Sequence, residues 1–107
     1  MTLTPAEWLA RLPGAGGVRY IRALRHGSME LELYAPRGTD AQEPHARDEL
    51  YFVVNGQGRF DLDGVVTPFA AGDALFVPAF TPHRFIDFSD DFATWVVFYG
   101  PVGGEEP

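Results

Sequence analysis

Two histidines and one glutamate are the side chains in this sequence whose types and spacing suggest metal chemistry. His45 stands four residues before Glu49, and His83 follows much later in the chain. Imidazole nitrogen and carboxylate oxygen together form a ligand set for first-row divalent metal ions. In an extended strand every second side chain points the same way, so His45 and Glu49 would share one face. If His83 meets that face across a barrel interior, the three side chains bind one ion.

Composition excludes several other chemistries. The chain has 107 residues, no cysteine and no lysine, because all eight of its basic residues are arginine. Disulfides, thiolate ligands, cysteine nucleophiles and Schiff-base lysines are therefore excluded. The net charge of −7 argues against nucleic acid and anionic membrane surfaces as partners. Any catalysis is left to carboxylates, histidine, tyrosine or a bound metal.

The sequence shows no secretory or membrane-spanning pattern. The opening residues, Met1 to Pro5, lack a basic region followed by an apolar run. No apolar stretch approaches the roughly 20 residues that a membrane helix needs. We therefore expect a cytoplasmic protein without a membrane partner.

The two ends of the chain differ in composition from its middle. Residues 1–17 predict a short helix and a loop, because Thr4, Pro5 and Glu7 fit the start of a helix and a proline with three glycines follows it. Residues 101–107 are proline, glycine and glutamate apart from one valine, which predicts a flexible tail.

Short strands fill the middle of the chain, residues 18–100. The apolar pattern either alternates or is continuous, and turn residues recur at short intervals, which predicts an all-β sandwich or barrel. Asp63-Gly64 is a typical two-residue hairpin turn. The predicted strands cover residues 18–24, 29–34, 50–54, 59–62, 65–69, 74–77, 83–88 and 92–99.

Three of these strands, residues 50–54, 74–77 and 92–99, are apolar on both faces. A small barrel has one inner face, so the outer apolar side chains require a second layer or a partner subunit as cover. We therefore expect a homodimer. The alternative is that the helix and the long loops cover this surface.

Two further residues whose side chains could bind a metal, Asp48 and His26, are interpreted otherwise. Asp48 has the opposite strand parity to Glu49 and is expected to be solvated or paired with an arginine. His26, the third histidine, lies beside Gly27-Ser28 in a predicted turn and fits no motif. Neither is expected to bind the metal.

The order of glycines, histidines and glutamate resembles the two motifs of the cupins. Glu49 is followed by six residues and then Gly56, and three residues separate His45 from Glu49, as the motif requires. Further along, Gly72, Pro78 and His83 match the second motif at the right spacing. The resemblance covers roughly residues 30–99. It implies a double-stranded β-helix, that is, a jelly-roll cupin barrel, here with a short N-terminal helix.

The sequence departs from this family pattern at three positions. Glu43 replaces the first histidine, Phe80 replaces a glycine, and Asp87 replaces an asparagine. The resemblance implies three histidines and one glutamate as metal ligands, and only His45, Glu49 and His83 match. Glu43 is either a fourth, carboxylate ligand or a solvent-facing residue. Without it, two histidines and one carboxylate remain, as in the facial triad of non-haem iron oxygenases.

The resemblance leaves more than one function open. The first is a metal-dependent enzyme, dioxygenase- or isomerase-like, that acts on a small oxygen-rich molecule, with Glu43 or Tyr51 moving protons. The alternatives are a non-catalytic module that binds or senses a small ligand, and a closed metal site that only stiffens the barrel. Iron, manganese, zinc, nickel and copper all suit this ligand set.

Overall fold

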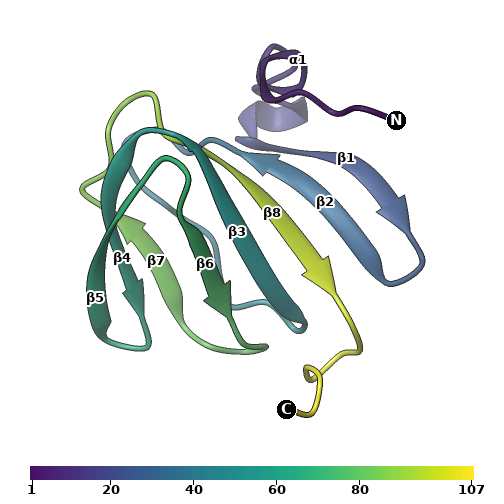
Figure 1. The fold of residues 1–107 in the computed structure, drawn as a ribbon. Coiled ribbons are helices and arrows are strands. Elements are labelled where there is room, and N and C mark those ends of the chain that lie inside the picture. The colour runs from purple at the N-terminus through teal and green to yellow at the C-terminus, as the bar shows by residue number, and fades with distance from the viewer.

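Eight strands, one short α-helix and one 3₁₀ turn make up the computed structural model, which describes all 107 residues (Figure 1). Their order along the chain is α1 (Pro5–Leu9), η1 (Ala15–Gly17), β1 (Tyr20–His26), β2 (Met29–Tyr34), β3 (Asp48–Asn55), β4 (Gln57–Leu62), β5 (Val65–Ala70), β6 (Ala74–Val77), β7 (His83–Ile86) and β8 (Ala93–Tyr99).

The strands form two antiparallel sheets that enclose the core. One sheet has five strands in the order β1-β2-β8-β3-β6, and the other has three in the order β5-β4-β7. Figure 1 shows the two sheets facing each other, with α1 beyond the β1-β2 end of the larger sheet. The predicted all-β jelly-roll barrel with a short N-terminal helix is confirmed.

Local sequence explains the turn between β4 and β5 and the start of the N-terminal helix. Asp63 and Gly64 have φ values of 50° and 88° and connect β4 to β5 by a tight hairpin, as the sequence predicts. The N-terminal helix begins at Pro5, as expected, but it ends at Leu9. Thr4 stands at its N-cap in an extended conformation without a side-chain hydrogen bond.

Aromatic rings dominate the core between the sheets. Phe85 lies at its centre, with ring centroids 4.7 Å from Phe92, 4.8 Å from Phe60 and 4.9 Å from Tyr51. Such edge-on and tilted contacts stabilise more than burial of area alone. The cluster comprises Tyr34, Tyr51, Val53, Phe60, Phe69, Val77, Phe85, Phe92, Val96 and Phe98.

Strand β3 shows the expected alternation between the two faces of the sheet. Glu49, Tyr51 and Val53 are buried on the inner face, whereas Phe52 on the outer face is 45% exposed. Its neighbour strand β6 exposes Phe76 to a similar extent, 48%. The homodimer expected from the apolar outer faces stays a prediction.

The C-terminal residues return to the start of β3. The N–H of Gly103 donates to the Ala46 carbonyl at 2.7 Å, and the N–H of Glu105 donates to Asp48 Oδ2 at 2.8 Å. Asp48 also accepts from the Ala79 N–H and is buried, so the expectation of a solvated or arginine-paired side chain is wrong. The flexibility of residues 101–107 stays a prediction. None of the helices has the length and apolar character that crossing a membrane requires.

Candidate metal centre

Two of the three candidate ligands come from facing sheets, and the third comes from the segment before β3. Glu49 lies near the start of β3 on the inner face of the larger sheet, and His83 is the first residue of β7 in the smaller sheet. His45 precedes β3 in a segment without regular structure. The backbone N–H of Phe80 donates to the His45 carbonyl at 2.6 Å and fixes that segment.

The structure brings His45, Glu49 and His83 together. Glu49 Oε1 lies 2.8 Å from His83 Nε2 and 3.2 Å from His45 Nδ1. One potential ligand atom from each residue lies within 4.8 Å of the others. The side chains of Glu49 and His83 are almost wholly buried, with exposures of 1% and 0%, whereas that of His45 is 34% exposed.

Hydrogen bonding fixes the proton of the His83 ring. Its Nδ1 lies 2.9 Å from the Thr81 carbonyl oxygen, which accepts only, so Nδ1 carries hydrogen and donates. In the neutral ring Nε2 then presents a lone pair to Glu49. Glu49 Oε2 is buried without a hydrogen-bond partner, and the buried Nε2 of the neutral ring has no hydrogen to donate to Glu49 Oε1, which lies 2.8 Å away. Buried polar atoms without partners are rare in folded proteins, and here two occur side by side.

A divalent metal ion fits this arrangement. Metal–nitrogen and metal–oxygen bonds in proteins are about 2.0–2.2 Å long, so two donors at right angles on one ion lie about 3 Å apart. The distances from Glu49 Oε1 to the two histidine nitrogens, 2.8 and 3.2 Å, have this size. The orphaned nitrogen and oxygen atoms would gain a partner in the ion.

The pKa values at the site reflect the same mutual attraction. Burial by itself would raise the pKa of Glu49, but hydrogen bonds and charge interactions with His45 and His83 outweigh it and lower that pKa. Burial would lower the pKa of His83, but Glu49 and the Thr81 carbonyl outweigh it and raise that pKa. Without a metal, both shifts favour a protonated His83 facing the Glu49 carboxylate.

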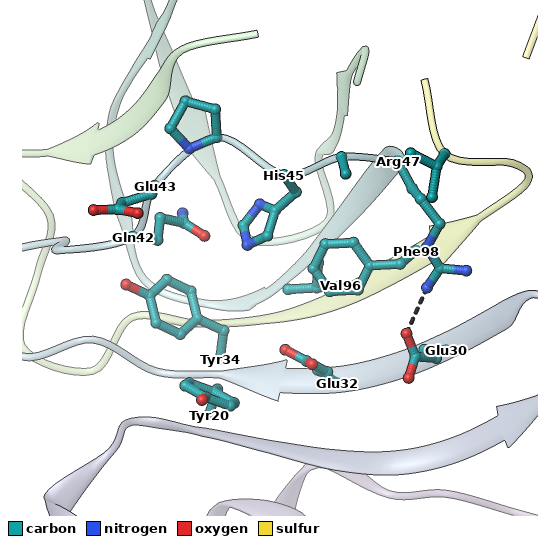
Figure 2. Close-up of a pocket in the computed structure, with 13 residues that line it drawn as sticks. Tyr20, Glu30, Glu32, Tyr34, Gln42, Glu43, His45, Arg47, Val96 and Phe98 are labelled. Carbon is teal, nitrogen blue, oxygen red and sulfur yellow. Dashed lines mark hydrogen bonds and ion pairs between the residues drawn. The ribbon is translucent and has the colours of Figure 1, made fainter. Parts of the chain in front are cut away.

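A pocket of about 610 Å³ opens beside the three side chains (Figure 2). Of the three, His45 is the member that lines it, and Figure 2 shows the His45 ring pointing into it. The remaining lining residues come from β1, β2, β8, the segment before β3 and the C-terminal segment: Tyr20, Glu30, Glu32, Tyr34, Gln42, Glu43, Pro44, Ala46, Arg47, Val96, Phe98 and Val102.

Glu43 is not a member of the three-residue group. It lines the pocket, is exposed, and in Figure 2 its carboxylate points away from the His45 ring. Its role as a fourth ligand stays a prediction. The neighbouring Gln42 is half-buried; its Nε2 donates to Asp40 Oδ2 at 2.9 Å, and its Oε1 accepts from the Tyr51 hydroxyl at 3.3 Å.

Sequence reasoning missed Asp40, which connects the segment before β3 to both sheets. This buried carboxylate accepts hydrogen bonds from the Tyr34 hydroxyl at 2.5 Å and from the Phe85 N–H at 2.9 Å, besides two from Gln42. Tyr34 belongs to the larger sheet and Phe85 to the smaller one. Burial and the bond to Asp40 raise the pKa of Tyr34, so its hydroxyl stays protonated.

Comparison with known proteins finds relatives by sequence. An uncharacterized protein of Streptomyces coelicolor is 40% identical over 84 residues, which cover 77% of this chain and 80% of that protein. An acireductone dioxygenase of Parasynechococcus marenigrum is 38% identical over 87 residues, but the match spans 47% of its length.

Solved structures agree at the level of the fold. A cupin 2 conserved barrel domain protein from Salinispora arenicola superposes with a TM-score of 0.71 at 22% identity, over 94% of this chain and 89% of that one. The family model for the cupin domain matches residues 30–99. Together with the two-sheet barrel, this match shows that the chain belongs to the cupin domain family.

Proposed function

We propose that His45, Glu49 and His83 bind a divalent metal ion and that the protein is a metal-dependent enzyme acting on a small oxygen-rich molecule. The chemistry would be dioxygenase- or isomerase-like, and the ion iron, manganese, zinc, nickel or copper. The observation that carries this proposal is that one potential ligand atom from each of the three residues lies within 4.8 Å of the others, two of the residues being buried.

The accessibility of the group favours an enzyme over a purely structural metal site. Three protein donors leave further coordination positions on an ion, as in catalytic rather than structural sites. His45 connects the group to a pocket large enough for a small molecule. When bound, the metal would supply Lewis-acid chemistry, polarising an oxygen of the substrate or acidifying a water.

The protein's own residues would bind the metal ion and orient the side chains that hold it. Glu49 and His83 are held rigidly in the core, and His83 is oriented by the Thr81 carbonyl. Burial and the nearby Glu49 charge raise the pKa of Tyr51, so its hydroxyl would stay protonated and keep its hydrogen bond to Gln42 rather than transfer a proton. Glu43, at the pocket rim, is the carboxylate left for proton exchange with solvent.

The pocket also suits a cupin that only binds or senses a small ligand, and turnover decides between the two. We further propose a homodimer that covers the apolar outer face around Phe52 and Phe76, and a cytoplasmic location.

Metal content provides the first test. Purified wild-type protein should contain about one divalent ion per chain by elemental analysis, and His83→Ala should contain almost none. His26→Ala is the matched control, because His26 is an exposed histidine outside the group, and it should retain the full complement. Full metal content in a folded His83→Ala variant would show that the proposed site is wrong.

Activity is tested on the loaded protein. Oxygen uptake with a panel of diketones and catechols tests the dioxygenase version, and proton exchange or isomer formation followed by NMR tests the isomerase version. Ligand binding without any metal-dependent turnover would show a binding module instead.

A further inference from the structure

Glu32 lies on the wall of the pocket across from His45. In β2 it pairs with Val96 of β8, which pairs in turn with Tyr51 of β3, so these three residues form one row across the inner face of the larger sheet. Figure 2 shows the Glu32 side chain projecting from β2 into the pocket, facing His45. A molecule bound beside His45 would therefore contact it.

Other charged and polar groups of the same wall already have partners in the protein. Glu30, two residues earlier on β2, accepts from Arg47 at 2.5 Å and from Arg22 at 3.0 Å. Tyr34, two residues later, donates to Asp40. Glu32 is half-buried and has neither a hydrogen bond nor an ion pair in this structure.

The pocket consequently has unbalanced negative charge. Arg47 is its one arginine and is engaged by Glu30, while His45 belongs to the metal group. Burial and the neighbouring Glu30 raise the pKa of Glu32, because no cation of the protein compensates its charge fully. The rings of Tyr20, Tyr34 and Phe98 also line the pocket, and aromatic faces attract cations.

We propose that Glu32 is a specificity-determining residue that binds a protonated amine of the substrate while oxygen atoms of the same molecule bind the metal. This inference rests on the proposed function and adds the substrate class: small molecules with an oxygen chelating group at one end and an ammonium group at the other. An ammonium group donates a charge-assisted hydrogen bond to Glu32 and cancels its charge.

Two probes of equal size test this on the metal-loaded protein. Aminobutanohydroxamic acid and pentanohydroxamic acid both chelate a metal through two oxygens and differ in carrying an ammonium or a methyl group at the far end. By calorimetric titration, wild-type protein should bind the amino probe about tenfold more tightly, the scale of one charge-assisted hydrogen bond. Glu32→Gln should bind both probes equally, with unchanged metal content. Asp90→Asn, at an exposed acidic residue outside the pocket, is the control and should keep the preference.

The outcomes separate this inference from the proposed function. Protein that binds no metal contradicts both. Protein that binds metal but binds the two probes equally, or binds neither, contradicts the role of Glu32 and leaves the metal site standing. A preference for the amino probe that survives in Glu32→Gln also overturns it. Circular dichroism of each variant shows that the barrel is folded.

Discussion

The backbone N–H of Phe80 donates to the carbonyl oxygen of His45 at 2.6 Å. Phe80 has a φ of 62°, in the left-handed region that favours glycine, and its side chain is 58% exposed. A strained residue in the loop before β7 thus anchors His45, the one member of the three-residue group that lies outside a strand. Phe80 also occupies the position at which the second cupin motif has glycine.

Replacing Phe80 by glycine should stabilise the protein. Glycine adopts positive φ without the steric cost of a Cβ atom, which is about 1 kcal/mol, and little burial is lost at an exposed site. Thermal unfolding should show a rise in Tm of a few degrees. Phe80→Ala is the control: it removes the same ring but keeps the Cβ, so it should not stabilise. An equal gain in both variants would assign the effect to the ring rather than to the backbone.

Asp40→Asn should destabilise the fold by about 2–4 kcal/mol. One of the two carboxylate oxygens becomes an NH₂ group facing donors, so bonds from Tyr34, Phe85 or Gln42 are lost in a buried setting. Urea unfolding measures the loss. Asp90→Asn, an exposed aspartate without a hydrogen bond, should change stability by less than about 0.5 kcal/mol. If the two variants were equally stable, the structural role of Asp40 would be contradicted.

The metal-free protein should show a pH-dependent contribution from the His83–Glu49 pair. The pKa of His83 is raised above its ordinary value of 6.5, so its contribution is complete below that pH and is lost as pH rises through the raised pKa. The pKa of Glu49 is lowered from 4.5, so its contribution is present above that pH and is lost as pH falls through the lowered pKa. The pair should stabilise most between roughly pH 4.5 and 6.5.

The free energy of unfolding is measured over a pH series for wild-type protein and for His83→Gln, both treated with a chelator. The difference between them should shrink above about pH 6.5 in the metal-free protein. Added metal should reverse this trend, because an ion binds deprotonated imidazole and its affinity rises with pH. A difference that is constant with pH would contradict the raised pKa of His83.

The inward orientation of Glu49 could be predicted because strand periodicity is a local property, whereas the grouping of His45 and His83 with it is expected from the two cupin motifs. Glu49 lies inside β3, so alternation places it on the inner face with Tyr51 and Val53, and the structure agrees. The fold followed from turn residues such as Asp63-Gly64 for the same reason.

The segment before β3 could not be predicted in this way. Strand β3 begins at Asp48, so the alternation that would carry Glu43 to the side of Glu49 does not extend back to it. Gln42 instead is held by Asp40 and Tyr51. Likewise, Asp48 is buried because backbone N–H groups 31 and 57 residues away, at Ala79 and Glu105, donate to it. No short-range pattern contains such distant partners.

The unequal exposure of the three side chains determines how an ion would come and go. The side chains of Glu49 and His83 are almost wholly buried, whereas that of His45 is partly exposed and lines the pocket. If the ion leaves past His45, a small molecule bound in that pocket would block its route. Release would then be ordered, with the organic molecule leaving first and the ion second. A chelating agent in solution would remove the ion only from protein whose pocket is empty.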